Sequence, residues 1–298
     1  MKVAQDFATP KTYVSQRLKL HYLDWGNCDA PSLLLLHGGR DHCRTWDQVV
    51  AELRGDWHII TPDLRGHGDS EWVQSGHYGM DDLIYDLAEL IEQQHLAPLA
   101  LVGHSLGGNV CLRFSGLYPD RVRKLVAIEG LGPSPKLIAE EATRGVVERM
   151  HRWIGRQREL AGRVPRRYES IEEAQLRMQA VNPGLSAELA WHLTRHGVSR
   201  NEDGTYSWKF DNHLRVSPPL DMTRAEIQEL WGRIACPTML VYGGRSWASN
   251  PQTDGRLAHF RNATVAVIEQ AGHWVHHDRA AEFIALLRSF LASQVPRS

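Results

Sequence analysis

Short apolar runs recur along the chain, and almost every one of them ends at a glycine, a histidine or an acidic residue. Four lie in the first half, at residues 32–38, 58–63, 99–105 and 124–130. Two more follow towards the other end, at residues 237–244 and 263–273. Runs of this length without polar alternation are typical of parallel strands that are buried on both faces. The pattern therefore predicts a central, mostly parallel sheet.

Helical patterns separate these runs. Residues 81–94 place leucine and isoleucine side chains on one stripe, and residues 106–119 follow a helical pattern that stops at a proline. Residues 280–294 form a further amphipathic stretch. Residues 11–26 alternate in the manner of an antiparallel hairpin that opens such a sheet. Strands that alternate with helices predict a three-layer α/β domain with helices flanking the sheet.

The stretch between the two blocks of strands has a different pattern. Four of its apolar residues fall at helical spacing: Val146, Met150, Trp153 and Ile154. Residues 198–213 contain an Asp-Gly turn followed by alternating aromatic residues, which predicts a hairpin-like corner. We therefore expect a mainly helical insert. The expected division is a first part of the core at 1–133, the insert at 134–233 and a second part of the core at 234–298.

Composition and charge give no sign of an unusual partner. The 34 lysines and arginines nearly balance the 35 acidic residues, so the net charge of −1 creates no global field that would attract nucleic acid or anionic lipid. The first residues lack the apolar segment of a secretory signal, and no stretch approaches the roughly 18 apolar residues of a membrane span. We expect a cytoplasmic monomer or homodimer that binds neither nucleic acid nor membrane.

The four cysteines lie far apart and show no CxxC spacing: Cys28, Cys43, Cys111 and Cys236. A metal knuckle or a redox motif is therefore not predicted, and we expect reduced, mostly buried thiols.

One segment raises an alternative. Eight arginines lie between Arg144 and Arg167, as in a surface for RNA or a membrane. Glutamates are interleaved with them, at positions 140, 141, 148 and 159. This mixture favours the solvated face of helices in the insert.

The motif most closely tied to chemistry is "LALVGHSLGGNV", in which a buried strand leads through G-x-S-x-G into a helix. A serine hydroxyl exposed on a strained strand-to-helix turn leaves no room for side chains two residues before and after it. Gly103 and Gly107 fit this requirement, and Gly108 allows the helix to lie close to the sheet. Ser105 is therefore the candidate nucleophile, with a helix-capping serine as the less favoured alternative.

Four motifs follow the first, second, third and last strands of the core, in this order: "LHGGR", "PDLRGHGDS", "GHSLGG" and "AGHWVHHD". Together they resemble the α/β-hydrolase superfamily over the whole core, about two thirds of the chain. The resemblance implies the α/β-hydrolase fold, and it implies that the insert is the helical cap that follows the sixth strand. It also implies a cofactor-free serine hydrolase, because dehalogenases and epoxide hydrolases of this fold carry Asp at the position of Ser105.

A serine nucleophile needs a base, and His273 is the candidate. It follows a β-run and a glycine, which places it on a loop at the carboxyl edge of the sheet beside Ser105. His277 lies four residues further on, so a zinc site is an alternative. No HExxH motif or matching carboxylate accompanies the pair. We therefore predict no metal ligands here and expect His276 and His277 at the start of the last helix.

The third member of such a triad is an acid that orients the imidazole. In most members of the superfamily it is an Asp shortly after the penultimate strand, where this chain has Ser246. Glu129 ends the apolar run at 124–130, which is the sixth strand when the two strands of the hairpin are counted, and some members carry the acid there. A deeply buried carboxylate at this position requires a partner. We favour Glu129 over the alternative acid Asp254, because a strand end is a more rigid platform than a loop. A salt bridge from Glu129 to a cap arginine is the structural alternative.

An acyl-transfer site also needs donors for the oxyanion. The N–H of Leu106, at the helix start, is one candidate. The second belongs to the "HGGR" turn, and the resemblance favours Gly39 over Arg40. For an aromatic, apolar acyl pocket under the cap we select a few residues near these loops: Arg40, His104, Trp153, Trp247 and Trp274.

These residues predict a carboxylesterase-like enzyme that cleaves a small or medium acyl ester through an acyl-enzyme. A lactonase, a perhydrolase or a carbon-carbon bond hydrolase would use the same groups. A non-catalytic ligand-binding protein on this scaffold is the alternative from another class.

Overall fold

The computed structural model describes residues 8–74, 77–216 and 218–293. In this part of the chain eight strands form one sheet in the order β1-β2-β4-β3-β5-β6-β9-β10. Their bounds are Thr9–Ser15 (β1), Leu18–Asp24 (β2), Ser32–Leu36 (β3), His58–Pro62 (β4), Leu99–His104 (β5), Val122–Ile128 (β6), Thr238–Gly243 (β9) and Ala263–Ile268 (β10). The pairs β1–β2 and β2–β4 are antiparallel, and all other neighbours in the sheet are parallel. The predicted α/β fold with a mostly parallel sheet is confirmed.

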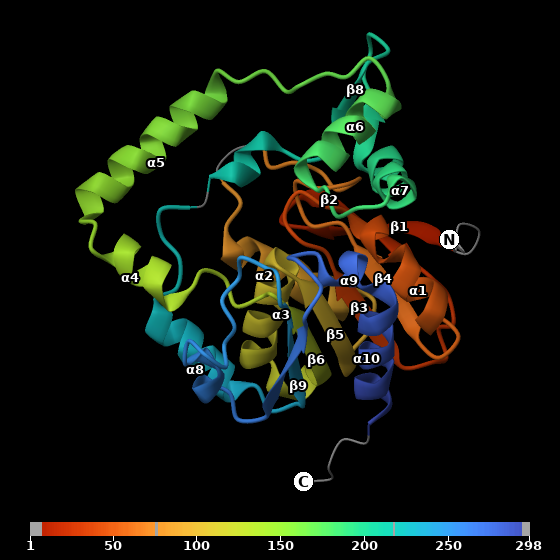
Figure 1. Cartoon of the computed structure of the whole chain (residues 1–298), viewed down its shortest axis with the longest axis vertical. Helices are drawn as coiled ribbons and strands as arrows, with labels where there is room; N and C mark the ends of the chain where they lie inside the picture. Colours follow the sequence, from red (N-terminus) through yellow and green to blue (C-terminus); the bar gives the residue numbers. More distant parts are fainter. Residues whose placement is uncertain (1–7, 75–76, 217, 294–298) are drawn as a thin grey trace.

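Helices cover both faces of the sheet (Figure 1). One face packs against α2 (Met80–Gln93), α3 (Leu106–Leu117) and α8 (Arg224–Arg233). The other packs against α1 (Asp47–Leu53), α9 (Val275–Asp278) and α10 (Ala280–Ala292). Within β3, Leu34 and Leu36 belong to the first hydrophobic cluster, whereas Leu33 and Leu35 belong to the second. Because successive side chains of a strand point to opposite faces, a continuous run of leucines fills both layers.

The connection between β6 and β9 holds the predicted insert. Its elements are α4 (Pro135–Ala142), α5 (Val146–Ala161), α6 (Ile171–Val181), α7 (Ala187–Gly197), β7 (Val198–Arg200), β8 (Tyr206–Trp208) and the 3-10 turn η3 (Asn212–Arg215). β7 and β8 form a separate antiparallel pair. Figure 1 shows α6 and α7 together on one side of the molecule and α4 and α5 as an arc on the other.

Helix α8 closes the insert and lies on the core. Thr223 and Glu226 form a reciprocal capping box at its start. A Cβ on Gly116 of α3 would lie only 2.4 Å from the carbonyl oxygen of Leu230, so the two helices approach closely at this glycine. Three further 3-10 turns connect core elements, at Cys43–Trp46 (η1), Pro119–Arg121 (η2) and Arg256–His259 (η4).

The predicted hairpin at the start of the sheet is formed by β1 and β2. Its turn residues, Gln16 and Arg17, have φ angles of 45° and 69°, the left-handed backbone that a tight hairpin connection requires. All four cysteines are free; Cys28 is exposed, and Cys43, Cys111 and Cys236 are buried. Within the described residues, no helix is both long enough and apolar enough to cross a membrane.

Candidate active site

Ser105 lies at a sharp turn between β5 and α3. Its φ and ψ are 50° and −112°, a combination that is strained for a residue with a side chain. A Cβ on Gly103 would lie 2.5 Å from the carbonyl oxygen of Gly107, and a Cβ on Gly107 would lie 2.5 Å from that of His37. Both flanking positions therefore require glycine, which is the steric reason for the G-x-S-x-G motif.

Glu129 directly follows β6, and its backbone also has a positive φ, of 50°. Its side chain is fully buried and has three polar neighbours at the ends of β9 and β10. Oε1 accepts the N–H of Gly243 at 3.0 Å. Oε2 accepts the hydroxyl of Ser246 at 2.6 Å and also a hydrogen bond from Nδ1 of His273. The buried carboxylate is thus held by the neighbouring strand and paired with an imidazole.

In the described part of the chain Glu129 has no ion pair with an arginine, so the alternative of a salt bridge to the cap is wrong. The bond to His273 uses Nδ1, which fixes the tautomer because a carboxylate can only accept. Nε2 of His273 is then left as the acceptor for a proton.

His273 follows β10 and is packed between two other rings. The indole of Trp247 lies 4.8 Å from the imidazole, centroid to centroid, and the ring of His104 lies at the same distance. Nε2 of His104 donates to the backbone carbonyl of His273 at 3.0 Å. His104 directly precedes Ser105, so it connects the turn that carries the serine to the loop that carries the imidazole. Among the described residues no direct hydrogen bond joins Ser105 to His273; such bonds often form only in the complex with substrate.

The turn after β3 lies against Ser105 and Leu106. A Cβ on Gly38 would lie 3.4 Å from Cβ of Ser105, and one on Gly39 would lie 3.8 Å from the Leu106 side chain. Leu106 is the first residue of α3, so its N–H has no partner within the helix. The two predicted oxyanion donors, the N–H groups of Gly39 and Leu106, therefore belong to adjoining segments.

His37 holds the shape of that turn. Its Nδ1 donates to the carbonyl of Gly38 at 2.7 Å, and its Nε2 accepts the N–H of Leu64 at 3.0 Å. Burial lowers the pKa of His37 to about 3, so the ring is neutral and able to make both bonds at once.

The alternative acid, Asp254, lies elsewhere. Its Oδ2 pairs with Arg256 at 2.7 Å and accepts the hydroxyl of Ser249 at 2.6 Å. Burial alone would raise its pKa, but the hydrogen bonds from Arg256 and Ser249 lower it. Arg256 also donates to the carbonyl of Gly132 at 3.2 Å, so this ion pair fastens the loop after Glu129 instead of contacting His273.

The α/β-hydrolase fold family matches residues 31–280 of this sequence. The chain belongs to the α/β-hydrolase family. Among its curated relatives, the esterase Rv0045c of Mycobacterium tuberculosis is 29% identical over 282 residues, 90% of this chain and 85% of the relative. The mouse sn-1-specific diacylglycerol lipase ABHD11 is 27% identical over 96% of this chain and 92% of the relative. Among solved structures, the hypothetical protein PA1622 of Pseudomonas aeruginosa has a TM-score of 0.82 at 24% identity, covering 95% of this chain and 99% of the other.

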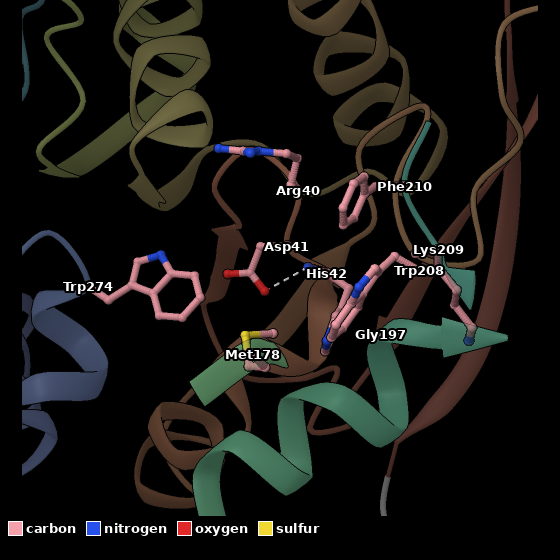
Figure 2. Close-up of a pocket in the computed structure, with 10 residues that line it drawn as sticks. Arg40, Asp41, His42, Met178, Gly197, Trp208, Lys209, Phe210 and Trp274 are labelled. Carbon is pink, nitrogen blue, oxygen red and sulfur yellow. Dashed lines mark hydrogen bonds between the residues drawn. The ribbon is translucent and has the colours of Figure 1, made fainter. Parts of the chain in front are cut away.

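The pocket residues predicted for this α/β-hydrolase fall in different places. Arg40 and Trp274 line a cavity between the core and the insert (Figure 2). Trp247 is 73% exposed and covers one face of His273. His104 is buried beneath the site, so it supports the loops and does not face the cavity. Trp153 is half-buried on α5 and is not among the residues that line the cavity.

Several residues of the site were not predicted. Met178, Trp208, Lys209 and Phe210 line the cavity from the insert, and the aromatic alternation after the Asp-Gly turn was the one signal for them. The bond from Ser246 to Glu129 had no sequence signal. His276 and His277 lie in the separate short helix α9, because the backbone at Arg279 leaves the helical region with φ −139° before α10 begins. His277 Nε2 contacts the Thr45 hydroxyl at 2.7 Å, so it is not joined with His273 in a zinc site.

Proposed function

We propose that this α/β-hydrolase is a carboxylesterase that cleaves a small or medium acyl ester through an acyl-enzyme. Ser105 is the nucleophile, His273 the general base and Glu129 the orienting acid. The observation that carries the proposal is the hydrogen bond from His273 Nδ1 to the buried Glu129 carboxylate, next to a serine on a strained glycine-flanked turn. The names of the relatives, an esterase and a diacylglycerol lipase, support an ester as substrate.

In the first half of the reaction the Ser105 oxygen attacks the ester carbonyl carbon while its proton passes to His273 Nε2. The imidazolium that forms faces Glu129, and a buried negative charge stabilises it more strongly than solvent would. The N–H groups of Gly39 and Leu106 stabilise the oxyanion. The intermediate then collapses, and the leaving alcohol takes the proton from His273.

In the second half a water molecule gives a proton to His273 Nε2 and attacks the acyl carbon. The intermediate collapses again, Ser105 recovers its proton, and the carboxylic acid leaves. No redox step or cofactor is required for this balance.

The apolar part of the cavity wall is suited to an acyl group, and Arg40, Asp41, His42 and Lys209 make up the polar part. Met178 and the rings of Trp208, Phe210 and Trp274 line it, next to the turn that carries Gly39 (Figure 2). Aromatic side chains supply a large apolar surface at little entropic cost.

The direct test combines covalent labelling with a substrate panel. A fluorophosphonate probe should label the native chain and fail to label Ser105→Ala. p-Nitrophenyl esters of graded acyl length, with lactones assayed alongside, should show ester turnover that peaks at short or medium chains. A chain that takes up no probe and turns over none of these compounds would be a binding protein, and the proposal would be wrong.

A further inference from the structure

Three buried side chains from distant parts of the sequence converge beneath the candidate active site. They are Asp41, after the turn that carries Gly39; His104, before Ser105; and His276, on α9. One ligand atom of each lies within 4.8 Å of the other two. Asp41 is 7% exposed and the two histidines are 1% exposed. The mechanism proposed above uses none of the three as an acid, a base or a nucleophile.

Each of the three presents a buried polar atom without a hydrogen-bond partner within the described chain: Asp41 Oδ2, His104 Nδ1 and both ring nitrogens of His276. Oδ1 of Asp41 is accounted for, since it accepts the N–H of His42 at 2.9 Å. Buried polar atoms in native proteins nearly always have partners, and one cluster with several orphaned atoms requires an explanation.

Most of these unpartnered atoms are hydrogen-bond acceptors, each with a free lone pair. His104 Nε2 carries the ring proton, because it donates to a carbonyl, so Nδ1 of the neutral ring is unprotonated. A carboxylate oxygen is likewise an acceptor, and neutral His276 offers a lone pair from one of its nitrogens. The structure gives Asp41 no ion pair with a lysine or arginine in the described part of the chain. Converging lone pairs of this kind are stabilised by a cation.

The rings are held in place by packing. The ring of His276 is stacked on Trp46 at 4.7 Å and lies 4.7 Å from the ring of His104. A metal site needs such support, because ligands fixed by their neighbours lose little freedom on binding. Asp41 also lines the cavity shown in Figure 2, where it lies between Trp274 and His42, so one member of the cluster borders this cavity.

We propose that Asp41, His104 and His276 form a binding site for a divalent transition-metal ion of the zinc class. Two imidazoles and one carboxylate are a usual donor set for such ions. Ligand bonds of about 2.0–2.2 Å place donor atoms roughly 3.3 Å apart, a separation within the 4.8 Å that bounds the spacing of these three donor atoms. The bound ion fastens together the three loops that carry Gly39, Ser105 and His273, and it stabilises the folded chain.

The competing occupant is a proton shared between Asp41 and His276, which would satisfy the same atoms without a metal. The experiment separates the two. The full-length chain is treated with EDTA, dialysed, and titrated with Zn²⁺ by calorimetry and with Co²⁺ by visible absorption. We expect one equivalent of either ion to bind, and saturating Zn²⁺ to raise Tm by about 5 °C.

Variants locate the ion. Asp41→Asn and His276→Gln should weaken Zn²⁺ binding by about a hundredfold or more. His277→Gln is the matched control, since His277 neighbours His276 on α9 but contacts Thr45, and it should bind as the native chain does. His273→Gln should also bind normally. Circular dichroism establishes that each variant is folded.

The proposal is overturned if the native chain binds no Zn²⁺ or Co²⁺ at about 100 μM, whatever the behaviour of the variants. It is equally overturned if binding survives in folded Asp41→Asn and His276→Gln, or disappears in His273→Gln. Because binding and Tm are measured without substrate, these outcomes are independent of whether the chain is an esterase.

Discussion

The Ser246 hydroxyl donates a 2.6 Å hydrogen bond to Oε2 of Glu129, the same oxygen that accepts from His273. Ser246 stands where the resemblance to other α/β-hydrolases led us to expect the acid itself. In the proposed triad the acid stands at the end of β6 instead of on the loop after β9, and that loop contacts it through the Ser246 hydroxyl. Together with the N–H of Gly243, this contact fixes the carboxylate oxygens relative to the imidazole.

If Glu129 is the acid, as proposed, Ser246 is a positioning residue that acts through it. Loss of a hydrogen bond to a buried carboxylate is worth about 1.5–3 kcal/mol, and part of it should appear in the rate. We predict that Ser246→Ala lowers kcat by about tenfold and leaves KM nearly unchanged. Ser249→Ala is the matched control, because Ser249 lies on the same loop but contacts Asp254. If kcat falls equally in Ser246→Ala and Ser249→Ala, the effect comes from the conformation of the whole loop and not from the hydrogen bond between Ser246 and Glu129.

The short distance between Ser246 and Glu129 also predicts a rescue. In Glu129→Gln the amide can present an N–H to the imidazole and favour the wrong tautomer. Ser246→Asp would introduce a carboxylate next to the position that Glu129 Oε2 occupies, from which it could accept the N–H of His273 Nδ1. We expect the double variant Glu129→Gln/Ser246→Asp to turn over p-nitrophenyl butyrate at least tenfold faster than Glu129→Gln alone. No gain in the double variant would show that the position of Ser246 cannot support His273.

Replacing a glycine next to Ser105 should lower the free energy of unfolding, because a side chain there would collide with the backbone. A Cβ on Gly103 would lie 2.5 Å from backbone oxygen, which cannot move away without shifting α3. We predict that Gly103→Ala lowers the free energy of unfolding by about 2–4 kcal/mol, measured by urea denaturation. Gly155, inside α5, has open space where a methyl group would lie, with nothing within 4 Å of that position. Gly155→Ala should therefore stabilise by about 0.5–1 kcal/mol, and a similar loss in both variants would contradict the steric argument.

Buried neutral histidines should make the fold sensitive to acid. Burial lowers the pKa of His37 to about 3, of His67 to about 4 and of His277 to about 3. Unfolding returns each ring to its ordinary pKa near 6.5, so the unfolded chain binds more protons than the folded chain below that pH. The stability these rings contribute is complete above about pH 6.5 and is lost as pH falls towards 4.

Urea denaturation at pH 7.5 and pH 5.0 measures this dependence, and we expect a loss of a few kcal/mol at the lower pH. His151, exposed on α5, provides the control: His151→Gln should leave the pH slope unchanged, whereas a folded His67→Asn should reduce it. A free energy of unfolding that stays flat over this range would show that these rings are not neutral in the folded chain.

The features predicted correctly from sequence were those encoded locally. The run of leucines in β3 and the glycines around Ser105 each impose one geometry on their own backbone, so the strand and the turn could be predicted without distant contacts. The preference for Glu129 over Asp254 as the acid used only the argument that a strand end is rigid, and it stays a prediction, although the structure pairs Glu129 with His273 and Asp254 with Arg256. The sequence "DGR" nevertheless contained the reason against Asp254, because Arg256 two residues on could pair with it.

The remaining features depend on contacts between distant residues. Ser246 reaches Glu129 only because β6 and β9 are neighbours in the sheet, and the order of strands cannot be deduced from any one run. The same holds for Asp41, His104 and His276, because Asp41 comes after β3, His104 ends β5 and His276 comes after β10. His104 was predicted as a pocket residue because it lies next to Ser105 in the sequence. In the structure its ring is buried beneath the site and donates a hydrogen bond to the carbonyl of His273.

The central claim is that Glu129 is the acid that orients His273, and the most direct measurement is the kcat of Glu129→Gln with p-nitrophenyl butyrate, next to that of Asp254→Asn. We predict a loss of about a thousandfold or more in Glu129→Gln and a change of less than about tenfold in Asp254→Asn. A Glu129→Gln variant that keeps nearly full activity, together with an inactive Asp254→Asn, would contradict the claim.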